Sequence, residues 1–238
     1  MSLPKIEYPM YEIYVKSLDR KVKFRPFLVK EEKILLMAKD GKDAESIRQA
    51  VNQIITNCVL EPIDVEALPL FDIEMIFLKL RAKSVGESVK LTFNCKNEVN
   101  GEVCNTDTDY KLELDKIDYE VPEGHDAKVM INDKQGVKLK YPTLKSIPTE
   151  DKSEFDLMLD SLIENIDYVF DGDQVYKITD VTEQEQIDFI ESLNKETMDK
   201  IENFFLTSPK VVLKDTIACK KCGFEHQLHA ESLLDFFI

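Results

Sequence analysis

The stretch Cys219-Lys220-Lys221-Cys222-Gly223 lies between two runs of strand-like residues near the end of the chain. A Cys-x-x-Cys turn lets two sulfurs converge, and Gly223 can adopt the positive φ that such a turn often needs. A second cysteine pair, Cys95 and Cys104, also has strand-like sequence on both sides. Each pair therefore has the order strand, cysteine turn, strand, and two such units that face each other form a zinc ribbon.

Both pairs together are predicted to bind one structural zinc ion through Cys95, Cys104, Cys219 and Cys222. Structural zinc takes four ligands in a tetrahedron, and thiolates bind it at about 2.3 Å. The first pair departs from the Cys-x-x-Cys spacing, because eight residues separate its cysteines. A short hairpin with its turn at Asn100-Gly101 would bring the two sulfurs together. A shared ion would close a long loop, so metal binding would be coupled to folding.

Two other interpretations of the cysteines stay open. A Cys-x-x-Cys motif can act in redox chemistry, although no thioredoxin-like βαβ pattern surrounds this one, and the thiols could also be unbound. Cys58 stands apart in an apolar run and is predicted to be a buried small hydrophobe. His226 and His229 lie near the second pair, but four thiols complete a site, so both are predicted to be surface residues.

Composition and charge limit the class of protein. The chain has 238 residues and 43% apolar content, which suits one large or two small packed domains. It has no run of about 18 apolar residues, which excludes a transmembrane helix, and its start lacks the apolar core of a secretory signal. We therefore expect it to stay inside the cell that makes it. A formal net charge of −15 disfavours nucleic acid and membrane partners and favours basic proteins.

Hydrophobic periodicity predicts an α+β fold with segregated helices and strands. The first part is predicted to form a hairpin over 11–24 and helices over 30–39 and 43–60. A third helix is predicted to be capped by Asp72 and ended by Gly86. Residues 87–141 then alternate as strands do, with a hairpin across 132–136.

The later part of the chain returns to helical periodicity. Helices are predicted over 153–165 and over 183–193, with a short hairpin over 169–176 between them. Thr182 and Glu185 fit a capping box at the start of the second of these helices. Asn194 is predicted to open one more helix, which Pro209 closes, and the last thirty residues are strand-like again.

The predicted architecture is a helical part plus an antiparallel β part with a zinc-ribbon-like four-cysteine site. Its segments are an N-terminal hairpin with helices (1–86), a β region with the first cysteine pair (87–145), a helical region (146–209) and C-terminal strands that pack back on the β region (210–238). The chain ends in the apolar run Leu233-Leu234-Asp235-Phe236-Phe237-Ile238. Because chain ends fray unless they are tied down, this run should pack against the core or insert into a partner.

No motif for catalysis is present. The sequence lacks a glycine-rich phosphate loop, a Walker A sequence, HExxH and GxSxG. Asp171 and Asp173 are predicted to flank a tight turn rather than to bind a cation. A catalytic zinc keeps an open coordination position, and four thiolates leave none. We therefore expect no enzymatic activity.

Three stretches carry a family resemblance. They are Leu3–Pro9 followed by Lys23–Leu36, then Asp72–Glu87, and finally the Cys-x-x-Cys-Gly turn followed by Leu233–Phe237. Together they resemble the baseplate hub and hub-assembly proteins of T-even-type contractile-tailed phages. The resemblance implies a non-catalytic protein that binds other baseplate hub proteins in the cytoplasm of an infected bacterium. It leaves open whether the protein stays in the tail baseplate of the virion or leaves after assembly.

Two other function classes compete with this interpretation. A zinc-ribbon protein can bind nucleic acid or belong to the transcription apparatus, but the acidic charge of this chain disfavours that class. An uncharacterised metalloenzyme is the other alternative. The apolar residues Phe24, Phe27 and Leu28 fit a core strand followed by a helix start, or else a docking surface for another baseplate subunit.

Overall fold

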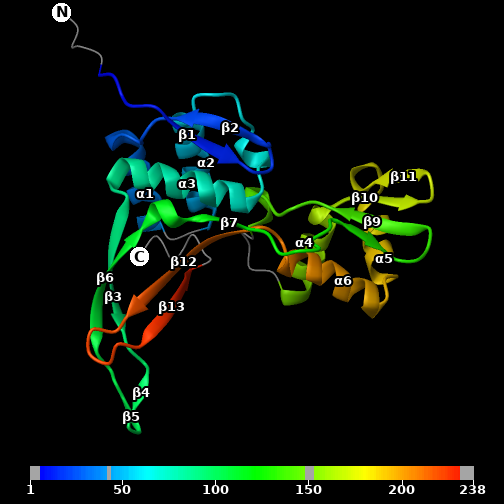
Figure 1. Cartoon of the computed structure of the whole chain (residues 1–238). Helices are drawn as coiled ribbons and strands as arrows, with labels where there is room; N and C mark the ends of the chain where they lie inside the picture. Colours follow the sequence, from blue (N-terminus) through cyan, green and yellow to red (C-terminus); the bar gives the residue numbers. More distant parts are fainter. Residues whose placement is uncertain (1–5, 42–43, 148–152, 231–238) are drawn as a thin grey trace, which may run out of the picture.

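The computed structural model describes residues 6–41, 44–147 and 153–230, and its fold is α+β, as predicted. The helices are α1 (Val29–Gly41), α2 (Ala44–Cys58), α3 (Leu70–Val85), α4 (Glu154–Asn165), α5 (Glu183–Glu191) and α6 (Lys195–Leu206). The strands are β1 (Tyr11–Val15), β2 (Arg20–Phe24), β3 (Ser88–Asn94), β4 (Glu98–Val99), β5 (Glu102–Val103), β6 (Asp107–Glu113), β7 (Asp118–Glu120), β8 (Lys128–Met130), β9 (Gln135–Leu139), β10 (Ile166–Asp171), β11 (Gln174–Lys177), β12 (Lys210–Ala218) and β13 (Glu225–Ala230). Figure 1 shows their arrangement.

The first core is the buried apolar cluster formed mainly by β1, β2, α2 and α3. The predicted hairpin over 11–24 is confirmed, with Ile13 opposite Val22 and both side chains buried. The inner face of α2 ends at Cys58, which is fully buried as predicted. Burial raises the pKa of the Cys58 thiol to about 11, so this thiol stays neutral within the apolar cluster, where Arg25 Nη1 lies 3.6 Å from its Sγ. Phe24 is a core residue, whereas Phe27 only packs against the core.

Asp72 does not cap α3, which corrects the prediction. The N-cap position is Pro69, and the Asp72 carboxylate lies fully buried within the first turn. It accepts hydrogen bonds from the backbone N–H groups of Lys16 (3.0 Å) and Ser17 (2.9 Å) and from the Tyr119 hydroxyl (2.6 Å). A buried carboxylate needs such donors, and these come from chain segments that local pattern cannot identify. Asp72 thus ties the β1–β2 turn and β7 to α3.

The second core is the buried apolar cluster formed by β8–β10 and α4–α6. Its sheet has the order β11-β10-β9-β8, and all three pairings are antiparallel. The predicted hairpins are confirmed, and the turn at Gly172 has φ +58°, as a tight turn between Asp171 and Asp173 requires. Thr182 and Glu185 form the predicted capping box, and the Asn194 side chain caps α6.

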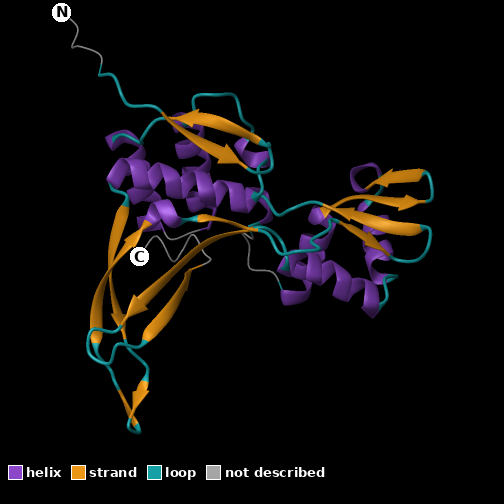
Figure 2. Cartoon of the chain, viewed as in Figure 1, coloured by secondary structure: helices purple, strands orange, loops and turns teal. Residues whose placement is uncertain are grey.

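The arm is the set of strands β3–β6, β12 and β13, which extends from the side of the first core (Figure 1). It contains only strands and loops (Figure 2). One layer pairs β3 with β6 over its full length, and the other pairs β12 with β13. At the base of the arm β12 also pairs with β7, which connects the arm to the first core. The β4–β5 hairpin forms the far end.

Tyr141 packs against both cores. Its ring lies 5.1 Å from that of Phe71 in α3 and 5.3 Å from that of Phe204 in α6. His125 stacks on the same side, 4.9 Å from Phe204. These ring contacts form an aromatic bridge between the two cores. The predicted division of the chain into four segments is not tested by them and stays a prediction.

Among the described helices, none combines the length and the apolar character needed to cross a membrane. The prediction for the apolar run Leu233–Ile238 falls outside the described residues.

Candidate metal centre

The first cysteine pair is positioned by the two long strands of one layer. Cys95 directly follows β3, and Cys104 directly follows β5. Between them β4 and β5 form the predicted short hairpin, with Asn100 at φ +56° and Gly101 at φ +84° in its turn. The backbone N–H of Cys104 donates to the carbonyl of Asn97 at 2.8 Å. The eight residues between the cysteines thus form a hairpin, which brings Cys95 and Cys104 close together.

The second pair is held by a tight knuckle between β12 and β13. Gly223 has φ +71°, as the sequence predicted for a residue without a Cβ. Its backbone N–H donates to the Cys219 carbonyl at 2.9 Å, and the Cys219 N–H donates to the Phe224 carbonyl at 2.9 Å. These bonds turn the chain sharply, so both sulfurs face the first pair.

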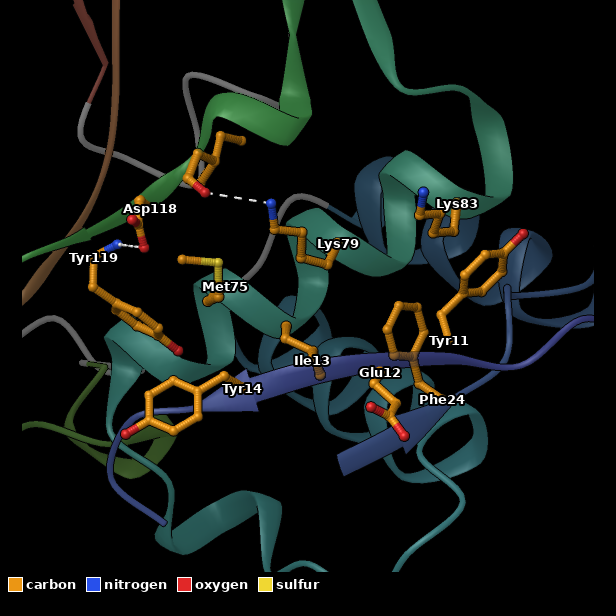
Figure 3. A pocket seen from close by; sticks show the side chains of 11 residues that line it. Tyr11, Glu12, Ile13, Tyr14, Phe24, Met75, Lys79, Lys83, Asp118 and Tyr119 are labelled. Atoms are coloured by element: carbon orange, nitrogen blue, oxygen red, sulfur yellow. Dashed lines mark hydrogen bonds between the residues drawn. The ribbon is translucent and has the colours of Figure 1, made fainter. Parts of the chain in front are cut away.

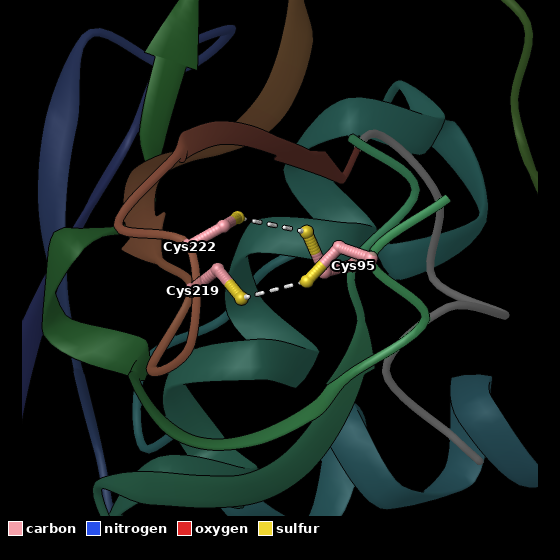
Figure 4. A group of neighbouring side chains, drawn as sticks. Cys95, Cys219 and Cys222 are labelled. Atoms are coloured by element: carbon pink, nitrogen blue, oxygen red, sulfur yellow. Dashed lines mark hydrogen bonds between the residues drawn. The ribbon is translucent and has the colours of Figure 1, made fainter. Parts of the chain in front are cut away.

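The structure brings the four predicted residues together. Their Sγ atoms all lie within 4.8 Å of one another. The Sγ–Sγ distance is 3.7 Å between Cys95 and Cys222 and 3.8 Å between Cys104 and Cys219. Both contacts cross from one layer of the arm to the other (Figure 4). A tetrahedron with metal–sulfur bonds of about 2.3 Å has sulfur–sulfur edges of about 3.8 Å, so this cluster has the size of a four-thiolate metal site.

The protein environment acts differently on two of the thiols. Backbone N–H groups of Cys222 and then Lys221 lower the pKa of the Cys219 thiol to about 6, because they stabilise its thiolate. Burial raises the pKa of the Cys95 thiol to about 12, because a buried thiolate is poorly solvated. A metal ion would have to displace a proton from Cys95, so binding at this cluster would release protons.

Contacts away from the cysteines also hold the two layers together. Asp215 of β12 accepts a hydrogen bond from the Tyr110 hydroxyl of β6 and forms an ion pair with Lys116 at 2.6 Å. These partners, Lys116 first, lower the pKa of the Asp215 carboxyl to about 2. The backbone N–H of Lys220 donates to the hydroxyl of Thr108 at 3.3 Å. The position of the knuckle thus also depends on side chains along the arm.

The prediction that His226 is a surface residue apart from the cysteines is wrong in one respect. The His226 side chain is half-buried rather than fully exposed, and its Nε2 lies 3.1 Å from the Sγ of Cys95. The imidazole is packed against the rings of Phe93 and Phe224, each with its centroid 4.7 Å away. Sequence reasoning missed this contact because Cys95 belongs to the opposite layer. The side chain of His229 is outside the described set.

A cleft of 420 Å³ lies over α3 between β1 and β7, away from the cysteines (Figure 3). Two lysines line it, and both already have acceptors. Lys79 Nζ lies 3.3–3.4 Å from backbone carbonyl oxygens that include that of Ile117, and Lys83 forms an ion pair with Glu87. The rest of the lining is mainly aromatic and apolar. Among the described residues, the cysteine cluster is the group of side chains that could hold a metal ion.

Comparison with known proteins identifies one family. A family model described as "T4 bacteriophage base plate protein" matches residues 8–238, which include the arm, both cores and all four clustered cysteines. No curated protein and no solved structure matches the chain.

Proposed function

Because the chain belongs to the T4 bacteriophage base plate protein family, we propose that it builds the central hub of the tail baseplate, or assists the assembly of that hub, by binding other hub proteins. The observation that carries this proposal is a family match over residues 8–238. The protein would act in the host cytoplasm during assembly, and it could remain in the virion tail baseplate. No catalytic residue is assigned.

The finer part of the proposal is a structural zinc ion bound by Cys95, Cys104, Cys219 and Cys222. Sulfur–sulfur distances of 3.7 and 3.8 Å support it, because they match the edges of a tetrahedral four-thiolate site. Four thiolates leave no open coordination position, so the ion would supply a cross-link and no chemistry. It would join the β3–β6 layer to the β12–β13 layer near the far end of the arm, at the base of the β4–β5 hairpin.

The arm is the surface that we propose for docking. Its layers expose apolar side chains at Leu91 of β3, Val99 and Val103 of the end hairpin, and Phe224 beside the knuckle. An exposed apolar surface on a projecting element is typical of a protein–protein contact. The proposed zinc ion would hold this surface in one conformation, which lowers the entropy cost of binding.

A pull-down from phage-infected cells, read by mass spectrometry, tests the docking role. Val103 in β5 is 51% exposed, and Val175 in β11 is 58% exposed, so they form a matched pair of hairpin valines. Wild type and Val175→Glu should recover other baseplate proteins, whereas Val103→Glu should recover several-fold less. Equal recovery of baseplate proteins by all three forms would contradict the proposal that the arm is the docking surface. Recovery of no baseplate protein by wild type would contradict the hub role itself.

Metal analysis of the purified protein tests the zinc proposal independently. We expect one zinc ion per chain in wild type and none in Cys222→Ser. A wild-type protein that contains neither zinc nor iron would contradict the metal site, whatever the pull-down shows. Iron in place of zinc would keep the four-thiolate site and change only the ion.

A further inference from the structure

We propose that His226 is a positioning residue of the metal centre, whose Nε2–H donates a hydrogen bond to the Cys95 thiolate from outside the ligand set. This inference rests on the proposed four-thiolate site. The Nε2–Sγ distance is 3.1 Å, which is shorter than the sulfur–sulfur distances in the cluster. Metal ligands are commonly oriented by such outer partners, and loss of a partner typically costs 10–100-fold in metal affinity.

The imidazole of His226 is held in place by packing. It projects from β13, where His226 pairs with Ile217 of β12. The rings of Phe93 and Phe224 both pack against it, each with its centroid 4.7 Å away. Phe93 belongs to β3, two residues before Cys95, so the same contact connects the two layers of the arm. The ring orientation is therefore fixed by aromatic contacts that do not depend on a metal ion.

His226 lies outside the set of metal ligands. The ligand atoms that lie within 4.8 Å of one another are the four cysteine sulfurs. Four thiolates complete a tetrahedron around zinc, so a fifth protein ligand has no place. A ring N–H at this distance from a sulfur is suited to donate a hydrogen bond to it, and this requires the tautomer with hydrogen on Nε2.

Cys95 has the greatest need of such a donor. Its side chain is fully buried, so water cannot solvate its thiolate. Four thiolates around a divalent ion carry a net charge of −2, which donors to the sulfurs reduce. Two of the other sulfurs also have donors outside the cluster: the backbone N–H of Lys221 lies 3.5 Å from Cys219, and Asn97 Nδ2 lies 3.9 Å from Cys222. Beside a backbone bond from Asn97, His226 provides the side-chain donor to Cys95.

The test is a zinc competition titration with a chromophoric chelator on wild type, His226→Phe and His226→Gln. Phenylalanine keeps a ring that can pack against Phe93 and Phe224 but has no N–H. We expect its zinc affinity to fall about 10–100-fold, and glutamine, which retains an N–H donor, to recover part of the loss. Gln227→Ala, at an exposed position next along β13, is the control and should bind zinc as wild type does. Circular dichroism checks that each variant is folded.

Cobalt substitution separates the outcomes. The absorption spectrum of the cobalt form should show four thiolate ligands in wild type and in His226→Phe alike. Unchanged zinc affinity in both His226 variants would overturn the inference and leave the four-cysteine site intact. A wild-type spectrum with three thiolates and one nitrogen, which His226→Phe alters, would make His226 a ligand and also overturn it. A wild type that binds no metal would contradict the zinc proposal itself.

Discussion

The arm and the second core contain similar strands but bury very different amounts of apolar surface. The second core has large side chains with almost no exposure, among them Ile166, Ile201 and Phe204. In the arm, β3 has no buried side chain, β6 buries only Thr108 and Leu112, and β12 buries Val211, Val212 and Ile217. Toward the far end of the arm, the buried side chains include two of the clustered cysteines, Cys95 and Cys219.

This difference indicates two ways to stabilise strands. Removal of apolar surface from water contributes about 25 cal/mol per Å², and the second core has enough such surface to hold its sheet on three helices. The arm has less, because two thin layers that project from the protein enclose only a few buried side chains. A metal cross-link between the layers would replace the missing burial. The following predictions test this contrast, in order of decreasing effect.

The largest effect should come from Cys219→Ser. Because structural zinc sites supply about 10–16 kcal/mol of binding free energy in zinc-finger peptides, loss of one ligand should abolish zinc binding and unfold the arm locally. Hydrogen exchange of β3, β6, β12 and β13 should become fast, while that of β8–β11 is unchanged. Cys58→Ala, outside the cluster, is the control and should keep the arm protected. An arm that stays protected without metal would contradict the contrast.

Ile201→Ala should destabilise the second core and leave metal binding in the arm unchanged. Ile201 in α6 is almost completely buried, and a change of this kind leaves a cavity that costs about 2–5 kcal/mol. Urea unfolding should show the loss, and zinc content should stay at the wild-type value. Leu206→Ala, on the same helix at a side chain with 64% exposure, should change stability by about 0.5 kcal/mol or less. If Ile201→Ala reduced hydrogen-exchange protection in the arm as much as in the second core, the arm and the second core would unfold together.

Gly136→Ala should destabilise the second sheet by about 1–3 kcal/mol through overpacking. Gly136 lies opposite Phe170 in the central pair β9–β10, and an added Cβ would overlap the Phe170 ring and the Val129 carbonyl oxygen. Thermal unfolding measures the effect. Gly172→Ala has open space around the new methyl group, so its cost should be limited to the strain of φ +58°, about 1–2 kcal/mol. A Gly136→Ala variant as stable as wild type would show that Phe170 and Val129 can shift to make room for the added Cβ without loss of stability.

The smallest effect should be an acid sensitivity of the bridge between the cores. His125 Nε2 lies 2.9 Å from the Tyr141 hydroxyl, and Nδ1 lies 3.0 Å from the Thr207 hydroxyl. Burial lowers the pKa of His125, so between that pKa and the ordinary value of about 6.5 the unfolded chain binds more protons. Stability is therefore complete above about pH 6.5 and falls as the pH decreases.

Hydrogen exchange of β8–β11 at pH 7 and pH 5, corrected for intrinsic rates, measures this loss. In His125→Gln the second core should lose most of its pH dependence over that range. The arm should lose protection at low pH in both proteins, because protonation of the cysteines releases the metal. An identical pH dependence of the second core in both proteins would assign it to other groups.

Much of the fold followed from local pattern. The alternation around Ile13 and Val22, the capping box of Thr182 and Glu185, and the turn at Asn100-Gly101 each depend on residues that are close in sequence. The knuckle from Cys219 to Gly223 was predictable for the same reason. Such elements are fixed by side-chain period and backbone φ, which a single stretch of chain specifies.

The contacts that sequence reasoning missed all join distant segments. Aspartate is a typical helix-capping residue, but the buried carboxylate of Asp72 instead accepts hydrogen bonds from the backbone N–H of Lys16 and the hydroxyl of Tyr119. His226 is four residues from Cys222 yet contacts Cys95, 131 residues away. A single sequence shows which groups need a partner, but the partner is decided by how the layers pack.

The amino-acid sequence by itself determined the α+β class and the two cysteine turns, because each depends on neighbouring residues. Only the tertiary structure decided that sulfurs 115 and 127 residues apart lie 3.8 and 3.7 Å from each other. The packing of β12 and β13 onto β3 and β6 fixes these distances, since no local rule brings the two layers into register.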